Sequence, residues 1–169
     1  MSAVSVPVLD EVRDALVRLY RVRDGILRMY RFILGKYGID RLPTVKFYPD
    51  YIVMVTDDRV SYIAAMHYRG IIVLTPHILE ANYCFTVLHE LYHFIQYVTG
   101  TAGRSVSEVE AEADRWAKSI IDKYGDICSK YFNVTDLVTA LNVLNQLRLA
   151  DPKLYDELSS RFSDILFGG

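Results

Sequence analysis

The spacing of apolar residues predicts a long helix near the N-terminus. Between residues 10 and 37, apolar side chains recur every three or four positions, and arginines take much of the other side. This is the period of an amphipathic helix that buries one face. We expect Asp10 to cap its start, and Gly35 and Gly38 to end it. An arginine stripe can bind nucleic acid, but the acidic residues interspersed here favour a solvated helix face.

After Pro43 the pattern changes from helical to extended. Short segments rich in β-branched and aromatic residues are separated by turn-forming residues, and they span 45–48, 51–56, 60–68 and 71–75. They predict a small sheet of three or four strands, mostly antiparallel, with a hairpin around Gly70. His67 and His77 flank the final strand. We interpret each of them as an ordinary polar residue in preference to a catalytic one.

Helical signals return at Thr75 and Pro76, which have the pattern of an N-cap followed by the first helical residue. Ser105 and Glu108 have the spacing of a capping box for a later helix. Asn133 or Thr135 is expected near the cap of the next. The predicted helices span residues 82–99, 106–124, 135–149 and 152–166, and residues 167–169 are expected to fray. These elements predict a single α+β domain over residues 1–169.

The composition is that of a folded globular chain, with 51% hydrophobic and 24% charged residues. A net charge of -2 and a pI near 6.1 give no electrostatic reason to expect nucleic acid as a partner. No segment reads as a signal peptide or a membrane span, so we expect a soluble, cytoplasmic protein. Cys84 and Cys128 lie far apart and outside any C-x-x-C pattern, and they suggest neither a disulfide framework nor a cysteine zinc site. Cys84 is most simply a buried small hydrophobe.

The strongest chemical signal is the pentapeptide H-E-L-Y-H at residues 89–93. Residues four apart in a helix share one face, so His89 and His93 can both point at one ion. Glu90 lies on the flank of that face, where it can act as a general base. The alternative is a surface helix that carries two histidines by chance. The surrounding helix is broadly apolar, however, and a metal would satisfy all three polar side chains at once.

A catalytic zinc ion keeps three protein ligands, so a third must come from another element. The following predicted helix contains the acidic stretch E-V-E-A-E-A-D-R-W-A at residues 108–117. Glu110 and Asp114 are four apart and share a face. One can bind the ion while the other accepts a hydrogen bond from a ligating imidazole. Glu108 and Glu112 are alternatives to Glu110.

H-E-L-Y-H followed by E-x-E-A-D-R-W-A resembles the gluzincin metallopeptidases, in particular the small soluble minigluzincins of archaea and the related membrane-bound prenyl-protein and heat-shock peptidases. The resemblance implies a zincin-like fold in which His89, His93 and Glu110 bind zinc. It makes Glu90 the general base and directs Asp114 toward His89. The family register E-x-x-x-D favours Glu110 over its neighbours.

The resemblance also implies that residues 71–75 form the edge strand on which an extended peptide lies. Tyr92 stands where the family often has glycine, so some crowding is expected near the site. The transition state needs one more hydrogen-bond donor. His67, His77, Tyr131 or another tyrosine could supply it, and the sequence does not distinguish among them.

The predicted function is zinc-dependent hydrolysis of peptide bonds through a zinc-bound water activated by Glu90, with one zinc ion per chain and a peptide or protein as substrate. One alternative is a regulatory peptidase with a single dedicated protein substrate. A second is a zinc-stabilised interaction module without turnover. A third is a latent enzyme in which the C-terminal helices or tail fill the cleft.

Overall fold

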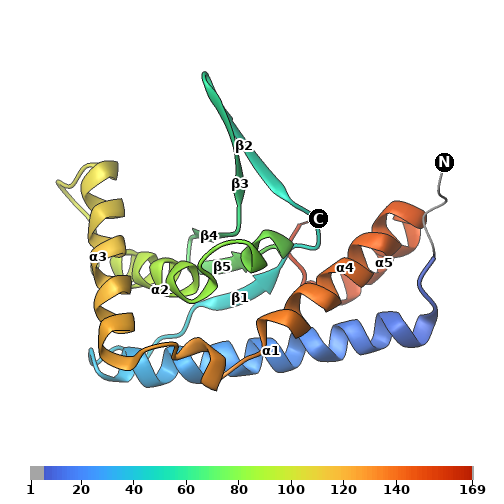
Figure 1. Cartoon of the computed structure of the whole chain (residues 1–169), viewed down its shortest axis with the longest axis horizontal. Coiled ribbons are helices and arrows are strands. Elements are labelled where there is room, and N and C mark those ends of the chain that lie inside the picture. Colours follow the sequence, from blue (N-terminus) through green and yellow to red (C-terminus); the bar gives the residue numbers. More distant parts are fainter. Residues whose placement is uncertain (1–5, 169) are drawn as a thin grey trace.

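The computed structural model describes residues 6–168 and shows an α+β fold with a long N-terminal helix and a small sheet (Figure 1). Two 3-10 turns, η1 (Pro76–Leu79) and η2 (Cys128–Lys130), lie between longer elements. The described part contains five α-helices, which are α1 (Leu9–Gly35), α2 (Tyr83–Thr99), α3 (Val106–Tyr124), α4 (Val134–Ala150) and α5 (Pro152–Arg161). The predicted helices are therefore all present, with bounds that differ by a few residues.

Helix α1 confirms the predicted amphipathic pattern, because its apolar face is buried along its whole length. Its end is also as predicted: the helix stops at Gly35, and Gly38 adopts a φ of 69°, which glycine tolerates without strain. Its start is not, because Val8 occupies the N-cap position. Asp10 lies inside the first turn, where its carboxylate accepts a hydrogen bond from Arg13 at 2.7 Å.

Helix α4 packs along α1, and the chain just before α4 approaches α1 closely at Gly25. A Cβ atom at Gly25 would lie 2.1 Å from the carbonyl oxygen of Tyr131. Glycine is therefore required at this position for the two segments to meet. The N-cap of α4 is Asn133, whose side chain accepts a hydrogen bond from the amide of Asp136.

The main sheet has three strands in the order β1 (Thr44–Phe47), β5 (Ile71–Leu74), β4 (Ala65–Tyr68). β4 and β5 form the predicted hairpin. Both residues of its turn have positive φ angles, 48° at Arg69 and 85° at Gly70. β1 pairs with β5 in parallel, so β5 is central and β4 is an edge strand. The expectation that residues 71–75 form the edge strand is therefore wrong. Strands that pair in parallel are far apart in the sequence, so the pairing of β1 with β5 leaves no local sequence signal.

The remaining strands, β2 (Ile52–Thr56) and β3 (Arg59–Ile63), form a separate antiparallel hairpin that projects from the body (Figure 1). The predicted run 60–68 is divided at Ala64. There the hydroxyl of Thr75 donates a hydrogen bond to the carbonyl of Ile63, and the backbone amide of Thr75 donates one to the carbonyl of Ala64. The expectation of one sheet with three or four mostly antiparallel strands is thus corrected to a three-stranded mixed sheet and a two-stranded hairpin.

The C-terminal segment returns to the sheet. Helix α5 ends at Arg161, earlier than the predicted 166, because the residues after it pair with β1. The amide of Phe47 donates to the carbonyl of Ile165, and the amide of Phe167 donates to the carbonyl of Phe47, each at 2.8 Å. Phe167 is therefore not frayed, while Gly169 lies outside the described residues. This segment lies beside β1, at the opposite edge of the sheet from β4.

Cys84 and Cys128 form a disulfide that joins the start of α2 to η2. Both side chains are buried, as expected for Cys84, but the expectation of unpaired cysteines is wrong. Their sequence separation of 44 residues gave no indication that the fold brings them together. Within residues 6–168, none of the helices is both long enough and apolar enough to cross a membrane.

Candidate metal centre

The site is built by α2 and α3, which pack against each other after a short connection. Helix α2 ends at Gly100, whose φ of 95° turns the chain, and α3 begins at Ser105, whose side chain accepts a hydrogen bond from the amide of Glu108. Both ends were predicted from the sequence. Because most of the α2 surface is apolar and buried, its few polar residues form a localised polar site beside α3.

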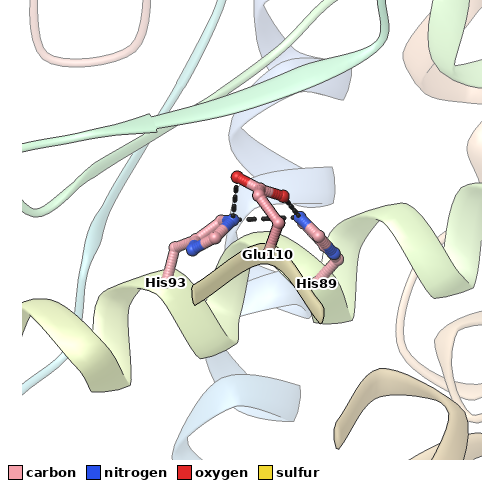
Figure 2. Close-up of side chains that lie close together, drawn as sticks. All are labelled: His89, His93 and Glu110. Atoms are coloured by element: carbon pink, nitrogen blue, oxygen red, sulfur yellow. Dashed lines mark hydrogen bonds and ion pairs between the residues drawn. The ribbon is translucent and has the colours of Figure 1, made fainter. Parts of the chain in front are cut away.

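His89 and His93 of α2 converge on Glu110 of α3 (Figure 2). The Nε2 atoms of the two imidazoles lie 2.9 Å apart. One carboxylate oxygen of Glu110 is 3.0 Å from His89 Nε2, and the other is 3.2 Å from His93 Nε2. One ligand atom from each residue lies within 4.8 Å of the others, which is a group able to hold a metal ion. The structure thus brings together the three residues that the sequence suggested as ligands.

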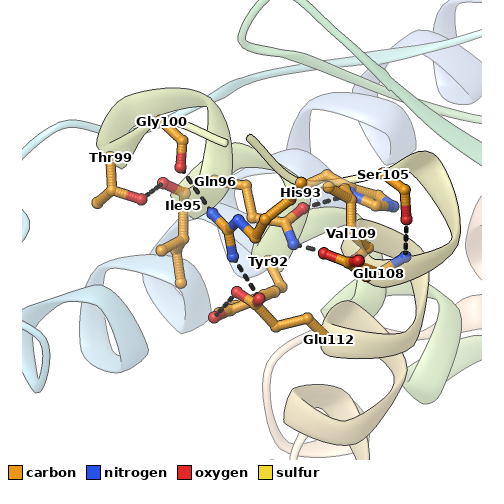
Figure 3. A network of polar contacts seen from close by, with 11 residues as sticks. Tyr92, His93, Ile95, Gln96, Thr99, Gly100, Ser105, Glu108, Val109 and Glu112 are labelled. Carbon is orange, nitrogen blue, oxygen red and sulfur yellow. Dashed lines mark hydrogen bonds and ion pairs between the residues drawn. The ribbon is translucent and has the colours of Figure 1, made fainter. Parts of the chain in front are cut away.

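The neighbours of His93 determine which ring nitrogen carries its proton (Figure 3). The side-chain NH₂ of Gln96 donates to the carbonyl of Val109 at 3.0 Å, which turns the amide oxygen of Gln96 toward His93 Nδ1 at 2.8 Å. An oxygen there can only accept, so we assign the proton of the neutral ring to Nδ1. The lone pair on Nε2 is then directed toward Glu110.

His89 has a carboxylate, that of Asp114, beside its Nδ1 atom. Its Nδ1 atom lies 2.7 Å from a carboxylate oxygen of Asp114, although the approach is not in line with a hydrogen bond, and this buried nitrogen has no other polar partner among the described residues. The carboxylate favours a proton on Nδ1. Two imidazole lone pairs and a carboxylate then face one another, an arrangement that a cation stabilises. The donor chemistry therefore fits a metal, and Asp114 lies where the sequence placed it.

Glu90 is buried beside the two histidines, with 8% of its surface exposed. Burial raises the pKa of its carboxyl above the ordinary value, while the nearby imidazoles of His93 and His89 oppose that rise. A buried carboxylate held next to a metal-binding group is suited to accept and return a proton. Glu90 does not belong to the group of three ligand residues, as expected from its position on the flank of the helix face that carries the histidines.

The other glutamates of α3 have different surroundings. Glu112 accepts a hydrogen bond from the hydroxyl of Tyr92 at 2.6 Å (Figure 3). It also forms an ion pair with Arg104. The Tyr92 hydroxyl and the Arg104 guanidinium hold the pKa of the Glu112 carboxyl below its usual value. Burial and the contact with Glu112 raise the pKa of Tyr92 to about 12. Tyr92 also stacks on Trp116, with ring centroids 5.1 Å apart, so its side chain contacts α3 and is not one of the clustered ligands.

An opening of about 350 Å³ lies beside the ligands, between the end of β4, helix α2 and the start of α3. His67 lines it together with His93 and Glu110. The other two proposed donors lie elsewhere. His77 pairs with Glu80 at 3.0 Å and packs against aromatic residues at the base of the β2–β3 hairpin. Tyr131 lines a separate hollow near η2.

Gln96 was not identified from the sequence. It is 3% exposed and bridges α2 and α3, and its amide oxygen is the hydrogen-bond acceptor that faces His93 Nδ1. The only sequence signal is its position three residues after His93, on the same side of the helix.

Replacing Gln96 by Leu is expected to weaken metal binding by about 10- to 100-fold, the usual effect of losing a partner that orients a ligating histidine. Leu is close in size to Gln but cannot accept the Nδ1 proton of His93. Metal affinity would be measured by competition with a chromophoric chelator. Gln96→Glu, which keeps an acceptor oxygen, should bind metal more tightly than Gln96→Leu. Equal affinity in the wild type and Gln96→Leu would contradict this role.

Comparison of the chain with family models, with curated proteins and with solved structures finds no match. The interpretation of the site therefore depends on its own residues and geometry.

Proposed function

We propose that this protein is a zinc-dependent metallopeptidase. The observation that carries the proposal is the convergence of His89, His93 and Glu110, with Glu90 buried beside them. Two imidazoles and one carboxylate are a ligand set of catalytic zinc, which leaves a fourth position open. A purely structural site is usually closed by four protein ligands and has no need of an additional buried carboxylate. The proposal agrees with the resemblance of the two motifs to gluzincins.

A bound zinc ion would supply Lewis-acid polarisation of a carbonyl group and would make water more acidic. The chain's own residues supply the rest. Glu90 takes a proton from the attacking water and delivers it to the leaving amine. Gln96 holds the imidazole of His93 in the tautomer that leaves Nε2 free, and the nearby Asp114 carboxylate favours the same tautomer of His89.

The edge strand β4 borders the opening beside the ligands. Its outer edge has no strand partner among the described residues, so it can pair with an extended peptide by strand addition. This assigns to β4 the role that the sequence had suggested for residues 71–75. The α5 helix and the described C-terminal residues do not line the opening, which gives no support to a latent form closed by the tail.

The proposal is tested by removing metal with a chelator, adding zinc back, and following both metal content and cleavage of an unstructured protein such as casein. We expect one zinc ion per chain, loss of cleavage in the metal-free protein, and recovery at one equivalent of zinc. Absence of bound metal after reconstitution would refute the site. Stoichiometric zinc with no cleavage, but with a higher melting temperature, would favour the zinc-stabilised interaction module instead.

A further inference from the structure

The opening beside the metal ligands contains a third imidazole, that of His67 on the edge strand β4. Its ring packs on α2 in the turn that follows His93. The centroid of the His67 ring lies 6.3 Å from that of the Phe94 ring and 5.6 Å from that of the Tyr97 ring. His67 is therefore held between the strand that borders the opening and the helix that carries two of the ligands.

The β4–β5 turn determines the tautomer of His67. The amide of Gly70 donates a hydrogen bond to His67 Nε2 at 3.0 Å. The positive φ angles of Arg69 and Gly70 create the tight turn that directs this amide back toward the ring. Because Nε2 accepts, the proton of the neutral imidazole resides on Nδ1. Burial, with a smaller contribution from His93, lowers the pKa of His67 to about 4, so the ring is neutral at pH 7.

The Nδ1–H group of His67 has no protein acceptor among the described residues, and it is not one of their buried unpaired atoms. It is therefore accessible to a molecule in the opening that His67 lines with His93 and Glu110. A neutral donor is also suited to this place, because a charged imidazolium would be repelled by a nearby metal cation. The hydrogen bond to Gly70 keeps the donor in position without giving the ring a charge.

We infer that His67 binds the peptide substrate by donating its Nδ1–H to a backbone carbonyl oxygen of a substrate peptide that lies along β4. This inference rests on the proposed peptidase function and deepens it by assigning a substrate-contacting donor. Of the three residues that the sequence named as candidate donors, only His67 lines this opening, since His77 and Tyr131 line other hollows. The ligand chemistry is the backbone carbonyl of an extended peptide.

Two replacements that are close to each other in size and shape test the Nδ1–H donor of His67. His67→Asn keeps an N–H group near the δ position, whereas His67→Leu has none, and both lose the imidazole ring and its Nε2 acceptor. We expect kcat/KM for a casein-derived peptide to fall about tenfold in His67→Leu, the order of one neutral hydrogen bond, and to stay within about threefold of wild type in His67→Asn. Zinc content should be equal in all three proteins.

Two readouts do not depend on turnover. In the wild-type protein, long-range ¹H–¹⁵N spectra should show His67 protonated on Nδ1. In a Glu90→Gln background, the same peptide should bind about tenfold more weakly with Leu than with Asn at position 67. An Nε2-protonated ring, or equal behaviour of the two replacements, would overturn the inference alone. Failure of the zinc-loaded wild type to cleave any peptide would instead refute the proposed function, and this inference with it.

Discussion

Replacing Glu90 by Gln is expected to reduce peptide cleavage by about three orders of magnitude while leaving the metal in place. General acid–base catalysis contributes about 10²- to 10⁴-fold, and Gln cannot accept and return a proton. Since Glu90 does not belong to the ligand group of His89, His93 and Glu110, zinc content should stay at one ion per chain. Turnover of an unstructured peptide, with metal analysis of the same sample, measures both effects.

The melting temperature gives an independent check on this variant. Burial raises the pKa of the Glu90 carboxyl, which shows that ionising it inside the protein is unfavourable. Gln has nearly the same shape and no charge to desolvate, so Glu90→Gln should be no less stable than the wild type. Loss of both cleavage and thermal stability would indicate a structural role. Retention of cleavage would exclude Glu90 as the proton carrier.

The existence of the helices, and the ends of α2 and α3, were the most predictable part of this fold, because their signals are local. The bounds of α3 and its Ser105 cap follow from a few neighbouring residues, and so does the β4–β5 turn at Gly70. The convergence of His89 and His93 follows from the helical repeat alone. These features need no knowledge of how distant segments pack.

What the sequence missed depends on contacts between distant segments. The parallel pairing of β1 with β5, which makes β4 the edge strand, joins segments separated by a hairpin. The Cys84–Cys128 disulfide depends on how η2 packs near the start of α2. Gln96 acquires its role only because the carbonyl of Val109, on another helix, fixes the orientation of its amide.

The choice among the three glutamates illustrates the boundary between these cases. Residues two apart on a helix point in nearly opposite directions, so Glu110 and Glu112 cannot both face the histidines. The motif register favoured Glu110, and the structure places it at the two imidazoles while Glu112 contacts Tyr92 and Arg104. Sequence spacing limited the possibilities, and the rotation of α3 against α2 decides between them.

This arrangement predicts opposite outcomes for two chemically identical substitutions. Glu110→Gln is expected to weaken zinc binding by more than about a hundredfold, exceeding the loss expected for a partner outside the ligand set, because it removes an anionic ligand. Glu112→Gln is expected to retain one zinc ion per chain. Dialysis against a weak chelator, followed by metal analysis of both variants, measures the difference.

Thermal unfolding with and without zinc separates the two roles further. A metal that binds only the folded state raises the melting temperature, so the wild type and Glu112→Gln should both be stabilised by zinc, while Glu110→Gln should not. Without metal, Glu112→Gln should melt below the wild type, because the charge-assisted contacts with Tyr92 and Arg104 are weakened. Metal loss in Glu112→Gln with retention in Glu110→Gln would reverse the assignment of the third ligand. Since the two substitutions differ only in which face of α3 they alter, that reversal would mean that α3 is rotated relative to α2.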